Sequence, residues 1–577
     1  MRVCVRTPPK ESAVSTPIVP TDRAVPTRAT AATSQPTGLY ALFFAEAWER
    51  FSYYGMRALL VLYMTKHLKF DKPQALAIYG TYTGLVYLTP FLGGILADKF
   101  LGRRKAVVIG GIVMALGHLA MAFEPLLYPA LGLLIVGNGF FKPNISTIVG
   151  GLYEEGDTRR DAGFTIFYMG INLGAFFSPI VCGALGEKVG WDYGFSAAGI
   201  GMVIGLGVFL WGQRFFGTVG LPPTKPGTTA ATSLVVGDWV HIAIGSLASV
   251  GLVFGTIRIW PSIGPVFWSV FNAIPLPGRV LVGLAILIGP MLGAKLDKTE
   301  WTRVAVIYIL CFFNIFFWMG FEQAGGTMTI FADEQTNRAS GPLTLVAIGS
   351  LLAVCSFAIK KSTEKESSGQ WLWKGLTAMF GVACVYYFVQ AGRALTGTPQ
   401  ADIPASMFQA INPLFIVAFA PFIGSIWTRL DSDAKTRTSS AVKMAIGMVI
   451  LGLGFVVMYI GQKGATGGAK IGPQWLLCVY ALHTLGELCL SPIGLSMVTK
   501  LSAPRILSLM MGVWFLSSAA ANKLAGSLEH IVEERHLPVY GVLIATSISA
   551  AIVLLVLSPV LKKWMHGGED AEGARGH

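Results

Sequence analysis

The sequence predicts an all-α polytopic membrane protein, and three observations lead to this fold class. Of the 577 residues, 53% are hydrophobic and only 13% are charged, whereas soluble domains carry about 25% charged residues. The 68 glycines suit transmembrane helices that approach one another closely. The basic residues lie in short loops between apolar segments, so the net charge of +13 indicates membrane topology and not a nucleic-acid partner.

The apolar segments are counted by length, because a helical span needs about 20 mostly apolar residues. An even count returns the C-terminus to the side of the N-terminus. With both termini in the cytoplasm, the basic loops, such as the one that holds Lys360, Lys361 and Lys365, fall on the cytoplasmic side. We expect about 14–16 transmembrane helices in the plasma (inner) membrane. The sixteen candidate segments are 39–65, 74–97, 105–123, 127–152, 161–185, 193–213, 237–257, 278–295, 302–331, 342–359, 371–391, 405–428, 439–461, 473–499, 505–527 and 537–561.

Two pairs of segments, 237–257 with 278–295 and 342–359 with 371–391, look like additions to a twelve-helix plan, since neither carries buried charge. The N-terminal stretch is rich in Pro, Thr, Ser and Ala, a composition typical of disorder. The predicted divisions are a disordered cytoplasmic tail at 1–36, a six-helix bundle at 37–214, a linker with two extra helices at 215–300, a second six-helix bundle at 301–564 with an inserted pair at about 340–392, and a cytoplasmic tail at 565–577.

The first segment contains charges where apolar residues are expected, in "EAWERFSYYGMRA". Glu46 and Arg50 are four residues apart, so they share a helix face and can pair. Tyr53, Tyr54 and Arg57 extend this polar stripe over about 16 Å, roughly half the hydrocarbon thickness. A charge at the bilayer centre costs about 2.5–3.5 kcal/mol. The stripe indicates the wall of a polar cavity; the alternative is an ion pair that holds helices together.

Three further charges, Lys142, Glu322 and Glu487, lie in other apolar segments, and Pro143 and Pro492 follow two of them. Buried ion pairs often add no net stability. A protein that opens alternately to two sides can make and break such pairs, and protonation of an acid would bias that equilibrium. The pattern therefore favours a proton-coupled transporter, with protons as the coupling ion and no cofactor.

Several motifs resemble one known family. "ADKFLGRRK" is similar to a loop of the major facilitator superfamily, and "EAWERFSYYGMRA" resembles the E-x-x-E-R-F-x-Y-Y-G signature of the proton-coupled oligopeptide transporter (POT) family. "FTIFYMGINLGAFFSP", "GFFKPNIS", "FEQ", "FQAINPLFI" and "GELCLSPIGLS" follow in family order. The resemblance implies the major facilitator fold, with two six-helix bundles plus extra helix pairs, and symport of protons with di- and tripeptides by a monomer.

The resemblance also implies a role for each matching residue in a central cavity. The residues expected to bind the peptide carboxylate are Arg50, Arg57 and Lys142. Those expected to hold the peptide amino terminus and backbone are Asn172, Asn412 and Glu487. The expected lining of the side-chain pockets is Tyr53, Tyr54, Tyr87, Trp318, Ser491 and Trp514.

Proton handling and gating are implied in the same way. The expected proton-coupling group is Glu46, Glu49, Arg50 and Glu322. Arg57 is expected to pair with Glu322 at an outer gate, and Lys142 with Glu487 at an inner gate.

Some positions depart from the family pattern or remain open. Animal members carry a histidine where this sequence has Gly80, so coupling here must rest on carboxylates. His483 either tunes Glu487, four residues later, or is a packed or interfacial histidine, and His118 is expected to be structural. The six cysteines in or near apolar segments have no paired spacing that would indicate a disulfide framework or a metal site.

Other functions agree with the sequence to different degrees. Plant relatives carry nitrate and other solutes, so the cargo could differ, although the paired carboxylate and amine sites favour peptides. A peptide sensor that does not transport remains open. An enzyme finds no support, because no nucleophile–base pair, metal cluster or nucleotide motif is found in the sequence.

Overall fold

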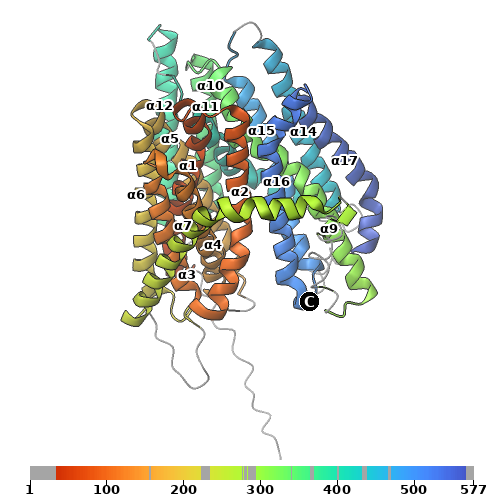
Figure 1. Ribbon diagram of the computed structural model, residues 1–577. Coiled ribbons are helices and arrows are strands. Elements are labelled where there is room, and N and C mark those ends of the chain that lie inside the picture. Colours follow the sequence, from red (N-terminus) through yellow and green to blue (C-terminus); the bar gives the residue numbers. More distant parts are fainter. Residues whose placement is uncertain are drawn as a thin grey trace, which may run out of the picture.

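The computed structural model describes residues 34–154, 157–222, 234–275, 277, 278, 283, 291, 294–339, 341–363, 370–398, 402–431, 438–465 and 469–566. The described part is almost entirely helical, and the β pairing found in it is an isolated bridge between Thr336 and Ile471. Figure 1 shows the helices as two groups that stand side by side. We call the end of the molecule where α1 starts and α17 ends the proximal end, and the opposite end the distal end.

The first group holds six long helices in chain order, and α1 packs mainly between α5 and α6. Asp71 caps α2 by accepting a hydrogen bond from the Gln74 amide at 2.7 Å. The helices are α1 (Thr37–Leu62), α2 (Lys72–Leu96), α3 (Arg103–Ala120), α4 (Leu127–Gly151), α5 (Arg160–Lys188) and α6 (Trp191–Gly212).

The second group repeats this pattern with a broken first helix. The chain leaves α9 at Phe321, makes a 3₁₀ turn over Glu322–Gly325 and continues in the short α10. A capping box of Asp297 and Glu300 starts α9. The helices are α9 (Lys298–Phe321), α10 (Thr327–Glu334), α13 (Ile411–Leu430), α14 (Ser440–Gly464), α15 (Gln474–Leu501), α16 (Leu507–Glu534) and α17 (Val539–Trp564).

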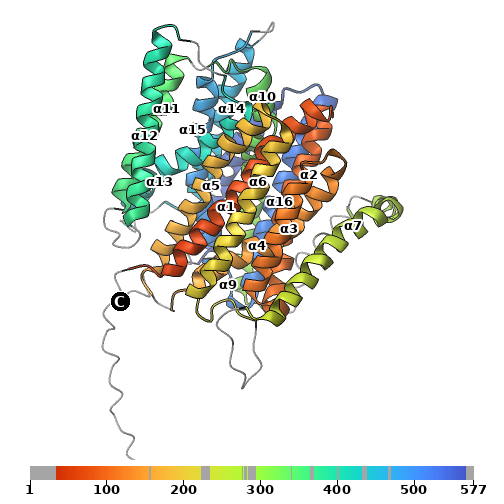
Figure 2. The same ribbon diagram turned by 90° about the vertical axis from the view of Figure 1, so that its left-hand side faces the viewer.

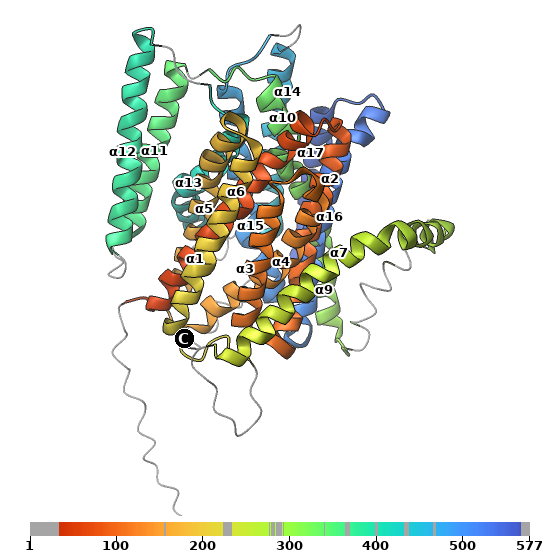
Figure 3. The same cartoon turned by 60° about the vertical axis from the view of Figure 1, so that its left-hand side comes forward.

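The remaining helices lie outside these two groups. α7 (Val236–Ala273) packs on α3 and α4 and then leans away from the molecule, whereas α11 (Pro342–Thr363) and α12 (Gln370–Leu395) form a hairpin at another side (Figures 2 and 3). The Trp373 ring of α12 meets Phe43 of α1 at 6.2 Å between centroids, and Phe380 meets Phe176 of α5 at 5.6 Å. The hairpin therefore rests on the first group, while α11 also packs on α13.

The predicted segments match the helices apart from shifts at their ends, the largest at the C-terminal end of α16, and two further corrections. The segment 237–257 is too short, because α7 continues along an apolar stretch to Ala273, with Pro261 and Pro265 inside the helix. The segment 302–331 is not one helix, since it breaks after Phe321 before a Gly-Gly pair. The predicted segment 278–295 and both predicted tails lie mostly outside the described residues.

The polytopic membrane character is confirmed. Eleven helices of the described part are long and apolar enough to cross a membrane, and α1, with its ionisable residues, is not among them. Each group has a buried apolar cluster of its own, one centred on α1–α6 and the other on α9 and α14–α17.

The two groups meet tightly at the distal end. At the crossing of α2 and α16, a Cβ atom on Gly80 would lie 2.6 Å from the Asn522 carbonyl oxygen and 2.7 Å from the Gly526 Cα atom. Ion pairs join the groups at the same end, between Lys66 and Asp333 (2.6 Å) and between Lys72 and Glu334 (2.7 Å). Within the described part, the ion pairs that cross between the groups lie at the distal end or at mid-depth.

Candidate functional site

A cluster of charges lies on α1 at mid-depth and is almost fully buried. The Arg50 Nε atom lies 2.8 Å from a carboxylate oxygen of Glu46 and 2.8 Å from one of Glu49. The three side chains are between 0% and 4% exposed. The Asn138 amide of α4 donates to Glu49 at 3.3 Å. We call Glu46, Glu49, Arg50 and Asn138 the Arg50 cluster; two acids therefore surround one arginine within the first group.

Two turns further along α1, Arg57 reaches the second group. Its Nη2 atom pairs with the Glu322 carboxylate, and its Nε atom donates to the Tyr79 hydroxyl at 2.5 Å. The guanidinium also lies 5.7 Å from the Tyr54 ring centroid, within the range of a cation–π contact. Glu322 is the first residue after α9, so the helix break places its side chain at the interface. The predicted pair of Arg57 and Glu322 is formed.

Lys142 and Glu487 take separate partners. The Lys142 ammonium lies 4.6 Å from the ring centroid of Tyr87 on α2. The Asn412 amide of α13 donates to the Glu487 carboxylate at 2.9 Å and to the Thr484 hydroxyl at 3.0 Å. No ion pair joins Lys142 to Glu487 among the contacts of the described residues. The inner-gate pair therefore stays a prediction, for a state in which α4 and α15 come together.

The other predicted lining residues occupy helices around these charges. Asn172 is 5% exposed and donates to the Tyr168 carbonyl of its own helix at 3.0 Å. Trp318 is half-buried, with its ring 5.2 Å from that of Phe321, and Trp514 is buried. Tyr53 is buried beneath Arg50, whose guanidinium lies 5.8 Å from its ring centroid. The side chain of Ser491 lies outside the described part.

Tyr54 connects the two sets of charges. It follows Arg50 by one helical turn on α1, and its ring lies 5.7 Å from the Arg57 guanidinium, which pairs with Glu322 of the second group. The first group contributes three cations, Arg50, Arg57 and Lys142, together with the two acids that hold Arg50, whereas the second group contributes the acids Glu322 and Glu487. Such an arrangement can bind a zwitterion with one end on each group. Within the described residues, no group of three or more His, Cys, Asp and Glu side chains could hold a metal ion.

Some of the polar contacts were not predicted. Asn138 lies one helical turn before Lys142, and this i, i+4 spacing is the signal that could have identified it. Tyr79 is the hydrogen-bond partner of Arg57, and Thr484 that of Asn412. The presence of glycine at position 80 has a steric explanation, because the backbone of α16 fills the space that a side chain would need.

The two histidines considered from the sequence are buried. His483 packs with its ring 4.7 Å from that of Phe455, beside Gly454 of α14. His118 is 0% exposed, in the last turn of α3. The packing of His483 agrees with the packed alternative; its influence on Glu487 stays untested.

Two helix groups around a central buried site of mixed charge define a class of protein, the secondary transporters of the major facilitator type. The POT family model matches residues 104–359 and 380–543. The chain is 34% identical to "Peptide transporter YePEPT" of Yersinia enterocolitica, covering 91% of this chain and 94% of the relative. It is 30% identical to a "Di-/tripeptide transporter" of Lactococcus lactis, covering 92% and 96%.

A solved structure of a peptide transporter POT in complex with sulfate is also similar. It superposes with a TM-score of 0.69 at 31% identity, covering 92% of this chain and 96% of that one. The chain belongs to the POT family. It is therefore a transporter and not an enzyme.

Proposed function

We propose that this protein is a symporter that moves di- and tripeptides into the cell together with protons. The peptide binds as a zwitterion between the two helix groups, and protons are the coupling ion, with no other cofactor. The protein works as a monomer in the plasma (inner) membrane, with both termini in the cytoplasm. The names of the relatives support peptides as the substrate class.

One observation carries the proposal: opposite charges face one site from different halves. Arg50, Arg57 and Lys142 belong to the first group, whereas Glu487, held by Asn412, belongs to the second. A peptide carboxylate suits the cations, because charge-assisted hydrogen bonds to guanidinium are strong and directional. A peptide ammonium suits Glu487. A ligand that carries both charges joins the halves, whereas a simple anion such as nitrate leaves Glu487 without a counter-ion.

The Arg50 cluster supplies a way to couple protons to peptide. An ionised Glu46 or Glu49 holds Arg50 by charge. When one of these acids is protonated, that hold weakens and the guanidinium is free for a peptide carboxylate. Proton and peptide then favour the same arrangement, which is the thermodynamic condition for coupling.

The basic loops determine which end of the molecule faces the cytoplasm. The loops at the proximal end carry the basic residues, such as Lys99 and Arg103, and basic loops stay in the cytoplasm. The distal end is then outer, and the contacts at Gly80 and at the Arg57–Glu322 pair are those of a transporter closed to the outside.

Uptake into proteoliposomes tests the function. Labelled dipeptide should accumulate when an inward proton gradient is imposed, and it should only equilibrate without one. Glu487→Gln should abolish uptake while the protein still elutes as a single folded species. Binding of peptide without any transport would instead indicate a sensor, and wild-type uptake by Glu487→Gln would remove this acid from the site.

A further inference from the structure

Glu187, in the last turn of α5, connects the two halves at the distal end through more hydrogen bonds than the Arg57–Glu322 pair. One carboxylate oxygen accepts from the Ser406 amide at 2.8 Å and from the Ser406 hydroxyl at 2.6 Å. The other accepts from the Ala405 amide at 3.0 Å. Arg338 contacts this second oxygen at 3.4 Å. Three of these donor groups belong to the start of the 3₁₀ segment η6 (Ala405–Ala410), which continues into α13.

Helix dipoles favour the Glu187 carboxylate charge at the second half and disfavour it at the end of its own helix. A carboxylate in the last turn of a helix faces the negative end of its own macrodipole. The same carboxylate is stabilised at the amide end of another helix, where backbone N–H groups have no intrahelical acceptor. The continuous segment Ala405–Leu430 presents that amide end to Glu187. The charge of Glu187 therefore has a favourable partner in the second half and an unfavourable one in its own helix.

The backbones approach closely beneath this contact. A Cβ atom on Gly183, one turn before Glu187, would lie 3.1 Å from the Ser406 Cβ atom. The glycine lets α5 come near enough for Glu187 to reach the two amides. The contact can form only while the distal ends of α5 and η6 stay together.

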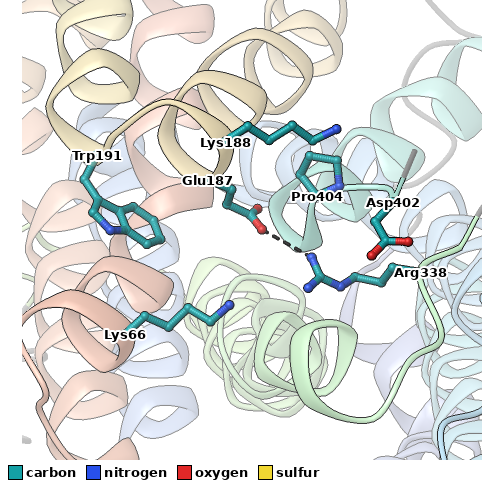
Figure 4. Close-up of a pocket in the computed structure, with 7 residues that line it drawn as sticks. All are labelled: Lys66, Glu187, Lys188, Trp191, Arg338, Asp402 and Pro404. Atoms are coloured by element: carbon teal, nitrogen blue, oxygen red, sulfur yellow. Dashed lines mark hydrogen bonds and ion pairs between the residues drawn. The ribbon is translucent and has the colours of Figure 1, made fainter. Parts of the chain in front are cut away.

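Water can reach the edge of this contact. Glu187 and Arg338 line a cavity of about 320 Å³, together with Lys66, Lys188 and Trp191 (Figure 4). The Glu187 side chain is 9% exposed and that of Arg338 is 20% exposed. When the halves separate, water can solvate the carboxylate and the freed amides, so the contact is reversible, unlike an ion pair sealed in hydrocarbon.

We propose that Glu187 is a positioning residue for the transport cycle: it locks the distal ends of the two halves by capping the η6–α13 segment, and so stabilises the state closed at that end. The proposal rests on the proposed function for its place in the cycle. The lock itself is a property of the closed state, and it can be measured without transport. Its effect adds to that of the Arg57–Glu322 pair, which uses different residues nearer the centre.

The distance between spin labels at the distal end tests the lock. Labels on cysteines at Lys69 and Lys470, in a background without native cysteines, report on the two halves from exposed positions. In Glu187→Ala we expect the ratio of the long-distance to the short-distance population to rise roughly tenfold or more, because several charge-assisted hydrogen bonds are lost. Glu187→Gln keeps an acceptor without the charge and should give a smaller rise, roughly threefold.

Two controls make the result specific. Lys188 is the next residue in the chain and lines the same cavity. Lys188→Gln removes its charge and should leave the distance between the labels unchanged. As a single substitution, Ser406→Ala should raise the population that is open at the distal end. In the Glu187→Ala background it should add little, because the Ser406 hydroxyl then has no carboxylate to which it can donate. If folded, monodisperse Glu187→Ala keeps the wild-type distance distribution, the lock is disproved, whatever the uptake assay shows. If the wild type fails to accumulate peptide while Glu187→Ala still opens, the proposed function fails and the lock stands.

Discussion

Two sets of charges on α1 are about 10 Å apart along the helix, and they differ in where their partners lie. Arg50 is held by Glu46 and Glu49 of its own helix, so the contact stays within the first half. Arg57 is held by Glu322 of the second half. The first set can change its protonation without any movement of the halves. The second must break whenever the halves separate at that level. One helix thus carries both the group proposed to sense protons and an arginine whose ion pair depends on closure of the two halves.

Of the substitutions that distinguish these two sets of charges, removal of Arg57 should have the largest effect on transport. Arg57→Ala leaves Glu322 buried and unpaired, which costs about 3–5 kcal/mol. Both gradient-driven accumulation and exchange of labelled for unlabelled peptide should fall sharply, because the state closed at the distal end is destabilised and one proposed ligand of the peptide carboxylate is lost. Lys72→Ala is the matched control, since its pair with Glu334 is exposed and is worth less than about 1 kcal/mol. Normal exchange by Arg57→Ala would mean that the pair is not part of the gate.

Neutral variants of the Arg50 cluster should separate the two activities. In Glu46→Gln or Glu49→Gln, proton-driven accumulation should be lost, while exchange between peptide-loaded vesicles and medium is retained. Exchange needs only binding and reorientation of the loaded carrier. Vesicles loaded with unlabelled peptide measure exchange, and empty vesicles under an inward proton gradient measure accumulation. Accumulation at the wild-type level by both variants would make these acids structural.

The sequence could predict contacts within one helix better than contacts between helices. The four-residue spacing of Glu46 and Arg50 fixes their common face, and the structure pairs them. The partner of Arg57 is 265 residues away, so spacing says nothing of it, and only the family resemblance named Glu322. The contact of Glu187 with Ser406 spans 219 residues and was not predicted, because it depends on how the distal ends of two halves meet.

The ends of the helices were also hard to predict from the sequence. Hydropathy alone placed a boundary at 257, yet α7 continues to Ala273 and contains Pro261 and Pro265, residues that the sequence pattern favours as helix ends. The break after Phe321 was missed because apolar composition continues through it, and the Gly325–Gly326 pair was the local signal.

A side chain at Gly80 should weaken distal closure by a smaller amount. The added methyl of Gly80→Ala would meet backbone atoms of α16 at 2.6 and 2.7 Å, and overpacking of this kind costs about 1–3 kcal/mol. We expect a lower midpoint of thermal unfolding and slower exchange. Gly207→Ala is the control, because the space around that glycine is open, and it should be neutral or slightly stabilising. An unchanged midpoint for Gly80→Ala would show that α2 and α16 can shift apart freely.

The smallest effect is expected at Asn138. Its hydrogen bond to Glu49 is long, at 3.3 Å, and its loss should cost about 0.5–1.5 kcal/mol. Asn138→Ala frees the Glu49 carboxylate to turn away from Arg50, so accumulation should fall by more than exchange does. Asn144→Ala on the same helix removes an amide that bonds only to its own helix, at the Phe140 carbonyl, and should not alter that ratio. Equal losses in both assays for Asn138→Ala would place Asn138 outside the coupling group.

The chain just after the first half is fixed to the proximal end of α3. The buried Arg104 side chain donates to the carbonyls of Gly217 (2.6 Å) and Val219 (2.7 Å), and its amide donates to Gly220 (2.9 Å). Lys105 pairs with Asp238 at the start of α7 at 2.6 Å. These partners emerge from the ribosome while more than half of the chain is still to be made. The first half can therefore fold and attach to the chain that follows it during synthesis, before α9 exists, and we expect the second half to dock onto it last.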